Sequence, residues 1–381
     1  MMDGLVLRAD PVRDTLATLA YRFALGAAEH DRAGSFPHEN FAALHDAGLL
    51  GLTVPRGLGC EGAPLAEVAE TVGILAEGCP ATALVLAMQA IHTRHVTQGP
   101  GWSARVRELV ASGAVDRGEL VNALRVEPEL GTPARGGLPA TVARRTAEGW
   151  SLTGRKIYST GAPGLSWGLV FARTEEEAPR TGMFLVPLRA PGVSIVETWD
   201  QAGLRASGSH DVLFQEVAIP ADQAGELRVP AEWGRPDVEQ AAWNTLLIAA
   251  LYTGVARAAR GWLLGFLRDR VPANLGKPLA TLPRMQEAVG RIEGLIRCNE
   301  RLVRSAALDG GGDANELALL KTTAAENAIE AVQQAVALCG NHALSRSNPL
   351  ERHLRDVLCA RIHTPQPDAA LTAAGRAALG Q

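Results

Sequence analysis

Cysteine is scarce in this chain and follows no pairing pattern. The five cysteines, an odd number, lie far apart: Cys60, Cys79, Cys298, Cys339 and Cys359. A disulfide framework needs an even, regularly spaced set, so we interpret them as reduced thiols and expect a cytoplasmic protein. The chain also lacks any lysine or arginine run, and its net charge is -4. This charge balance argues against nucleic acid as a partner.

Long apolar runs, leader-like segments and repeats are missing as well. No window of about 18 residues is apolar and free of charge, and no basic segment leads into an apolar one near residue 1. We therefore expect no membrane association. The 40 glycines and 22 prolines follow no period, which excludes collagen-like and repeat architectures. With 381 residues, 47% of them hydrophobic, the chain is long enough for two or three globular parts.

The periodicity of the apolar residues changes twice along the chain. Residues 1–118 have helical spacing, with a nearly all-apolar run over 81–96 that should be buried. Residues 119–224 break into short β-branched stretches typical of a small barrel or sandwich; the expected strands are 120–126, 140–146, 150–156, 168–173, 183–187, 193–197 and 212–217. Residues 225–381 return to helical patterns, at about 238–270, 281–308, 313–339 and 349–362, which predict a four-helix bundle. The fold class is therefore α+β in three parts.

Two short motifs suggest ligands that their context does not support. Gly57-Leu-Gly-Cys-Glu-Gly62 matches the dinucleotide pattern GxGxxG, but helical patterns stand where that fold needs strands. We interpret it as a glycine-rich turn between helices. His92 and His95 share one side of a helix, but no further metal ligand lies near them in the sequence, so we predict no metal site.

Three segments of the central part carry a resemblance to a known family: Glu119–Pro128, Gly149–Gly161 and Trp199–Val212. With the helix–β–helix layout, they resemble the flavin-facing strands of the acyl-CoA dehydrogenase superfamily. The resemblance implies an N-terminal helical domain over 1–118, a central β-domain over 119–224 and a C-terminal bundle over 225–381. It also implies a homo-oligomer, with a tetramer as the expected state.

The resemblance assigns flavin contacts within the β-domain. The family's aromatic-x-Thr stretch, which lies against the flavin ring, matches Tyr158 and Thr160, with Ser159 between them. The family's Gly-x-Arg-x-Ser pattern matches the turn after Trp199. This turn implies further cofactor contacts from Trp199, Ser207 and Ser209.

Two C-terminal segments resemble those that hold the far end of FAD across a subunit boundary. They contribute Arg270 and Gly340. The family's usual glutamine and second glycine are replaced here by Val336 and Cys339. FAD is therefore the implied cofactor, and FMN stays open.

The catalytic glutamate of the dehydrogenases is absent. Counting from Arg355-Asp356, its position is Thr364, and the alternative position on the first helix of the C-terminal domain is Asn244. Neither side chain can accept an α-proton near neutral pH. Glu239 lies close to the second position but out of register by more than a turn.

His363-Thr-Pro365 instead resembles the flavin monooxygenase branch of the superfamily, which includes dibenzothiophene monooxygenase. In that branch the histidine lies beside the flavin and supports oxygen chemistry. The positions that line the pocket there match Asn122, Ser159, Trp199, Ser209 and His363. We add Gln89 and His92 as expected residues of the substrate pocket.

These matches predict a two-component monooxygenase that uses O2 and reduced flavin on a small organic substrate. Because no nicotinamide-binding domain is visible, a separate reductase would supply the flavin. His363, Ser159 and Asn122 are the expected catalytic residues. Two alternatives stay open: an acyl-CoA dehydrogenase whose base is displaced to Glu239 or Asp368, and a flavin-binding or structural relic without turnover.

Overall fold

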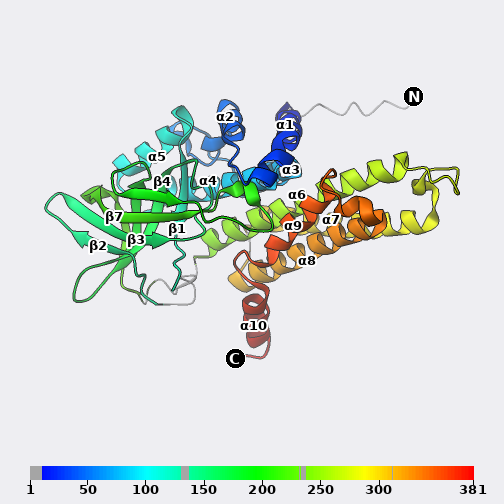
Figure 1. The fold of residues 1–381 in the computed structure, drawn as a ribbon. Helices are drawn as coiled ribbons and strands as arrows, with labels where there is room; N and C mark the ends of the chain where they lie inside the picture. The colour runs from blue at the N-terminus through cyan, green and yellow to red at the C-terminus, as the bar shows by residue number, and fades with distance from the viewer. Residues whose placement is uncertain (1–10, 130–136, 231, 233–236, 311) are drawn as a thin grey trace, which may run out of the picture.

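The computed structural model describes residues 11–129, 137–230, 232, 237–310 and 312–381. Two helical regions flank one β-sheet, as the sequence predicts (Figure 1). The N-terminal region contains α1 (Pro11–Ala33), α2 (His38–Asp46), α3 (Leu65–Gly78), α4 (Pro80–Gln98) and α5 (Ala104–Asp116). The sequence pattern did not single out α5. Gly57–Gly62 forms a turn between helices, as predicted, where the short 3-10 helix Arg56–Leu58 precedes α3.

The central part is one eight-stranded sheet. Its order is β6-β7-β3-β2-β4-β5-β8, and β1 pairs in parallel with β4. The strands are β1 (Leu120–Leu124), β2 (Val142–Arg145), β3 (Gly149–Lys156), β4 (Leu165–Thr174), β5 (Thr181–Pro187), β6 (Val193–Val196), β7 (Asp211–Pro220) and β8 (Ala224–Arg228). Seven strands match the predicted ones, and β8 was not predicted. The parallel β1–β4 pair places Asn122 beside Gly168, in the buried part of the sheet.

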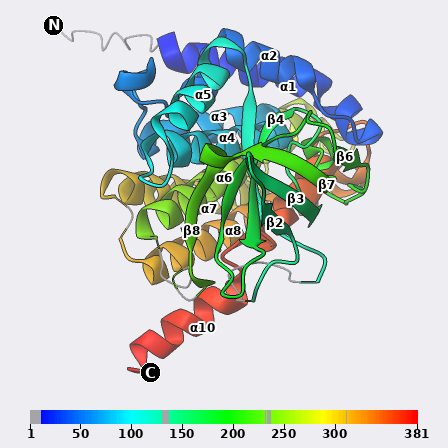
Figure 2. The same ribbon diagram turned by 90° about the vertical axis from the view of Figure 1, so that its left-hand side faces the viewer.

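The C-terminal region is a bundle of long helices with a short final arm. Its helices are α6 (Val238–Asp269), α7 (Pro283–Leu308), α8 (Ala314–Cys339), α9 (Leu350–Leu358) and α10 (Pro367–Ala378). The last helix, α10, projects from the body in both views and was not predicted (Figures 1 and 2). None of the described helices is both long enough and apolar enough to cross a membrane.

The bundle joins the N-terminal helices through very close backbone contact between α3 and α6. A Cβ added to Gly254 would lie 2.2 Å from the carbonyl oxygen of Gly73. No side chain larger than hydrogen fits there without moving one helix. This contact fixes the distance between α6 and α3. It therefore also fixes the position of Tyr252, which lies two residues before Gly254.

A second junction connects α9 to the turn between β6 and β7. Arg355 pairs with Asp31 of α1 (Nη2–Oδ2, 2.6 Å) and donates to the carbonyl of Ala202 (2.7 Å). The buried Asp356 accepts the backbone N–H of Leu204 (2.7 Å). A Cβ on Gly203 would lie 2.4 Å from the Arg355 carbonyl oxygen. We name this junction, formed by Asp31, Gly203, Leu204, Arg355 and Asp356, the α9 junction.

Gly254→Ala should destabilise the protein by about 1–3 kcal/mol, because the added methyl group forces α3 and α6 apart. Gly290→Ala is the matched control. Gly290 is exposed in α7, and its added Cβ would meet nothing within 4 Å. This control should be neutral or stabilising by up to about 1 kcal/mol, since alanine favours helix. Unfolding midpoints of both variants test the contact; equal effects would contradict it.

Asp356→Asn should change how stability depends on pH. Burial raises the pKa of Asp356 from 3.8 to about 6, while the Leu204 N–H bond opposes the rise. Between those two values the folded protein keeps a proton that the unfolded chain has lost, so wild-type stability falls as pH rises through this window. Asparagine keeps the acceptor and cannot ionise.

Relative to wild type, the variant should therefore gain on the order of 1–3 kcal/mol between about pH 4 and pH 7. Urea midpoints of the flavin-free proteins, measured across this range, give the difference. Parallel curves for the two proteins would show that Asp356 does not titrate in this way.

Candidate functional site

Three chain segments meet at the point where the sequence places the flavin. They are the middle of β1, the turn after β3 and the turn before β7. The amide of Asn122 donates to the carbonyl of Thr160 (2.8 Å). The Ser159 N–H donates to the His210 carbonyl (3.0 Å), and the Gly161 N–H donates to the Ser207 carbonyl (2.8 Å). The structure thus brings together residues that are almost 90 positions apart in the chain.

A chain of buried hydroxyl groups connects two of these segments. Ser207 and Ser209 share a hydrogen bond (2.8 Å), and the Ser209 hydroxyl donates to Thr160 Oγ1 (3.1 Å). The Ser159 hydroxyl is also buried, but it has no partner among the described residues. An unpaired buried hydroxyl costs free energy unless something binds it. Ser159 is therefore suited to hydrogen-bond a polar atom of a ligand.

Two aromatic rings form the outer wall of this cluster. Tyr158 is 57% exposed and meets Trp199 edge to face, with ring centroids 6.3 Å apart. The backbone of Tyr158 has φ 55°, a conformation that costs a non-glycine residue on the order of 1–3 kcal/mol. His210 Nδ1 accepts the N–H groups of Thr198 and Trp199 (3.1 Å each), which fixes the backbone that carries the indole. Strain at an exposed aromatic next to a buried unpaired hydroxyl is typical of a binding site.

A buried ion pair holds the end of β3, from which the turn with Tyr158 begins. Lys156 Nζ lies 2.6 Å from Glu127 Oε1, and both side chains are fully buried. Glu127 also accepts the Thr141 hydroxyl (2.6 Å) and the Ala140 N–H (2.6 Å). Burial alone would raise the pKa of Glu127, but the bonds from Lys156 and Thr141 outweigh it and lower the pKa. The pair fixes the end of β3 just before Tyr158.

His363 lies in the loop between α9 and α10 and is held by two other helices. Its Nδ1 is 2.8 Å from the hydroxyl of Tyr252 on α6. Lys321 on α8 donates to the carbonyls of Ala360 (2.7 Å), His363 (2.6 Å) and Pro365 (3.0 Å). Burial, together with the charge of Lys321, lowers the pKa of His363 to about 4. The imidazole is therefore neutral near pH 7 and can donate one N–H.

The α9 junction brings the start of this loop to the turn between β6 and β7. The Cβ position of Gly203 lies 2.8 Å from Cys359 Sγ, four residues before His363. In the described part of the chain, however, no hydrogen bond joins His363 to Asn122 or Ser159. Of the three residues predicted as catalytic, Asn122 and Ser159 thus lie in the β-sheet region and His363 lies in the loop after α9. No hydrogen bond joins them into one group in the described chain.

The two predicted pocket residues on α4 differ in their surroundings. Gln89 is buried, and its amide bonds the backbone of Leu50 (3.2 Å), Glu119 (3.3 Å) and Val121 (2.7 Å). These contacts connect α4 to β1 and do not support a direct role with substrate. His92 is half-buried, and burial together with His95 and Arg125 lowers its pKa to about 3. His92 is thus a neutral side chain, and its place in a substrate pocket stays a prediction.

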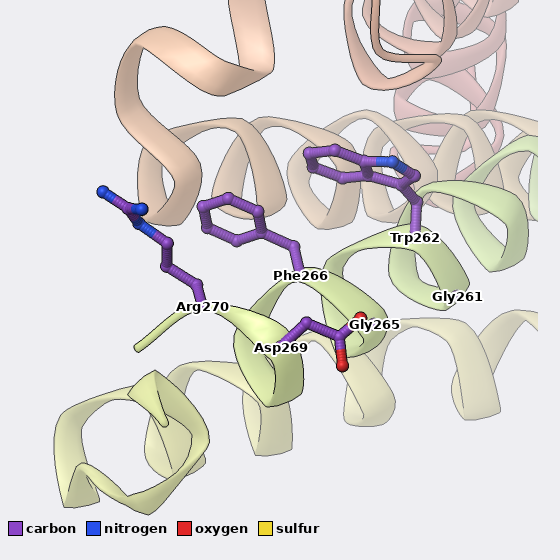
Figure 3. A pocket seen from close by; sticks show the side chains of 6 residues that line it. All are labelled: Gly261, Trp262, Gly265, Phe266, Asp269 and Arg270. Carbon is purple, nitrogen blue, oxygen red and sulfur yellow. The ribbon is translucent and has the colours of Figure 1, made fainter. Parts of the chain in front are cut away.

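Arg270 and Gly340 lie elsewhere, at the far end of the bundle. Arg270 lines an open cavity of about 450 Å³ together with Trp262, Phe266 and Asp269 (Figure 3). Gly340 ends α8 with φ 55°. Eighteen residues of helix separate Tyr252 from Arg270, a distance of about 27 Å at 1.5 Å per residue. Arg270 therefore lies far along α6 from the tyrosine that contacts His363.

The residues around Tyr158 fit a flavin. The exposed ring of Tyr158 and the indole of Trp199 offer apolar surface, and the unpaired Ser159 hydroxyl offers a hydrogen bond at the same place. The described residues bring no three histidine, cysteine or acidic side chains together as metal ligands. The donor set is therefore that of a flat, polar-edged organic group.

Sequence reasoning missed Tyr252, Lys321, His210 and the role of Asp31 in the α9 junction. The one signal for Lys321 is composition: lysine occurs at just three positions, 156, 277 and 321, and Lys321 stands among apolar residues of α8. Nothing local marked Tyr252, because its partner lies 111 residues later.

Models of the acyl-CoA dehydrogenase family match most of the chain. The N-terminal domain matches residues 10–98, the middle domain 125–217 and the C-terminal domain 246–366. The YdbM protein of Bacillus subtilis (strain 168) is 33% identical over 364 residues, covering 94% of this chain and 93% of its own.

Two further relatives have more specific names. L-evernosamine nitrososynthase of a Micromonospora species is 28% identical over 373 residues, covering 93% of this chain and 86% of its own. The solved structure of KijD3 in complex with dTDP is 29% identical and has a TM-score of 0.84, covering 99% of this chain and 98% of that one. The matched domains and the fold agree on one conclusion: this chain belongs to the acyl-CoA dehydrogenase family of flavoproteins.

Proposed function

We propose that this protein is a two-component flavin monooxygenase, which receives reduced flavin from a separate reductase and uses O2 to oxidise a small organic substrate. The observation that carries the proposal is His363, a neutral imidazole anchored by Tyr252 and by the Lys321-bound loop, in the segment where dehydrogenases of the family carry their glutamate. A neutral N–H donor suits oxygen chemistry, whereas α-proton abstraction needs a base.

The relatives support an amine nitrogen as the atom that is oxidised. One is named a nitrososynthase, and KijD3 has also been solved with FMN and a dTDP-linked 3-amino sugar, at 29% identity and a TM-score of 0.77. Amine oxidation requires an activated oxygen near a neutral nitrogen. Three hydroxyl groups, those of Ser207, Ser209 and Thr160, bond one another beside Ser159, and their neutral polar surface is compatible with that requirement.

The roles of the chain's own residues follow from their contacts. A bound reduced flavin supplies two electrons for the activation of O2. Tyr158 and Trp199 cover its ring and exclude water, and Ser159 donates to a polar edge. Asn122 holds the Thr160 carbonyl and so keeps the turn in shape. His363 donates its Nε2–H to the oxygen that develops negative charge, as in other preorganised donor sites.

The displaced-base dehydrogenase has weaker support. Glu239 is ion-paired with Arg94, whose guanidinium lies 5.0 Å from the ring centroid of Trp243. Thirteen residues of α6 separate Glu239 from Tyr252, about 20 Å along the helix. Asp368 is exposed in the first turn of α10. Glu239, which is paired and distant from His363, is therefore poorly placed to take a proton beside the same cofactor, and the exposure of Asp368 does not suit a base in a closed site.

For the cofactor, we propose that Arg270 and Gly340 contact the far end of FAD bound to a neighbouring subunit. The distance of about 27 Å between Arg270 and Tyr252 supports a second copy rather than the same site. A homotetramer would bring such a copy to the open cavity beside Phe266 (Figure 3). FMN would lack the part that reaches Arg270.

His363→Ala should lower product formation about a hundredfold, the usual scale for losing a positioned hydrogen-bond donor, while Glu239→Gln keeps most activity. The yield of oxidised product with reduced FMN or FAD, relative to a control without protein, measures the activity of both variants. If Glu239→Gln abolishes turnover of an acyl-CoA and His363→Ala has no effect, the protein is a displaced-base dehydrogenase. If neither flavin binds the wild type at tens of micromolar, about -6 kcal/mol, the non-catalytic alternative is supported.

Arg270→Ala should weaken FAD binding about tenfold or more and leave FMN binding unchanged, because only FAD extends to that arginine in the proposed assembly. Arg268→Ala, an exposed neighbour on the same helix, is the matched control and should change neither affinity. Fluorescence titration of the wild type and both variants with each flavin measures the six dissociation constants. Equal losses for FAD and FMN would contradict the cross-subunit role.

A further inference from the structure

Tyr252 is the one tyrosine buried in the interior of this protein. It is fully buried in α6, while Tyr21 and Tyr158 are 70% and 57% exposed. Burial raises the pKa of its phenol well above 10, so the hydroxyl keeps its proton. Its only hydrogen-bond partner among the described residues is His363 Nδ1, at 2.8 Å.

This geometry fixes which nitrogen of His363 carries the proton. If Nδ1 were protonated, it would donate to the tyrosine oxygen, and the buried phenol proton would have no acceptor in the described structure. Leaving a buried donor unpaired costs about 1–3 kcal/mol. The arrangement without that cost has Tyr252 donating to Nδ1, and the neutral ring then carries its proton on Nε2. In the described chain no group bonds Nε2, so this N–H is available to a ligand.

Lys321 fixes the backbone of the same loop. An ammonium group has three N–H donors, and Lys321 uses them on three carbonyls within six residues, those of Ala360, His363 and Pro365. The side chain is fully buried and has no carboxylate partner within ion-pair distance in the described structure. Desolvation lowers the pKa of Lys321 to about 8, so it is mostly charged near pH 7. Burying an ammonium group without a carboxylate partner costs free energy, which its hydrogen bonds to the loop carbonyls offset in part. Such a group therefore indicates that the conformation of this loop is important.

We propose that Tyr252 and Lys321 are positioning residues for His363: Tyr252 selects the Nε2–H tautomer and the ring orientation, and Lys321 holds the loop that carries the ring. The inference deepens the proposed function, because it explains how a neutral histidine presents one donor in a fixed direction. Neither residue needs to touch substrate or cofactor. Their effect reaches the reaction through His363 alone.

The test uses diethyl pyrocarbonate on the flavin-free full chain, since this reagent reacts with the unprotonated nitrogen of imidazole. In the wild type that nitrogen is Nδ1, which Tyr252 occupies, so His363 should react slowly. Tyr252→Phe should raise its rate about tenfold, the scale of one lost hydrogen bond. Peptide mass spectrometry follows His363, with the exposed His342 as an internal reference whose rate should not change.

Tyr21→Phe is the matched control, because it removes a hydroxyl from an exposed tyrosine on α1 and should leave the His363 rate at the wild-type value. For Lys321, hydrogen exchange over residues 359–366 should quicken in Lys321→Met, which keeps the length of the side chain but cannot donate. If that variant does not fold, the Tyr252 measurement still decides whether the tautomer is set as proposed.

An unchanged His363 rate in Tyr252→Phe would overturn the inference, whatever the activity of the protein. A raised rate in a protein that forms no oxidised product from an amine substrate with reduced flavin and O2 would keep the positioning role and reject the monooxygenase instead. In an active enzyme, Tyr252→Phe should lower kcat about tenfold with KM unchanged, because it alters the donor and not the binding surface.

Discussion

The α9 junction is the contact on which the site depends. Arg355 joins α1 and the Ala202 carbonyl, while the buried Asp356 accepts the Leu204 N–H from the turn that precedes Ser207 and Ser209. One pair of adjacent residues thus fixes the turn between β6 and β7 relative to the bundle. The loop that carries His363 begins at the end of the same helix. Loosening this junction would let the turn that carries Ser207 and Ser209 shift relative to the loop that carries His363. The relative geometry of the two is therefore set by contacts outside both.

The polar groups around the site are of two kinds, those that bond protein partners and those that do not. Glu127 with Lys156, Asn122 with Thr160, and Lys321 with three carbonyls all end on protein partners and hold backbone. The Ser159 hydroxyl is buried without a partner in the described chain, and His363 Nε2 bonds no described group. Because burying an unpaired polar group is costly, the Ser159 hydroxyl is suited to contact a ligand. This inference from burial agrees with the family resemblance, which had also named Ser159.

The fold could be predicted because its signals are local. Helical spacing gives α1, α4 and α6–α8, and β-branched stretches give seven strands within a few residues of their ends. Helices α5 and α10 were not predicted, because alanine, glycine and charged residues weaken their apolar pattern. Strand β8 was not predicted because it is a short strand at the edge of the sheet. The resemblance to the family also selected Tyr158, Ser159, Thr160, Ser207 and Ser209, which the structure brings into one cluster.

The partners of His363 could not be predicted, because they depend on packing between helices that are distant in the sequence. A tyrosine in the middle of a 32-residue helix is compatible with an ordinary core position. Only the contact with His363 in the folded chain gives its hydroxyl a hydrogen-bond partner. The same holds for Lys321, whose three acceptors are backbone atoms and leave no trace in side-chain identity. A sequence motif can indicate which residue reacts. The direction in which its N–H points is decided by groups that pack against it from elsewhere, and these are visible only in the folded chain.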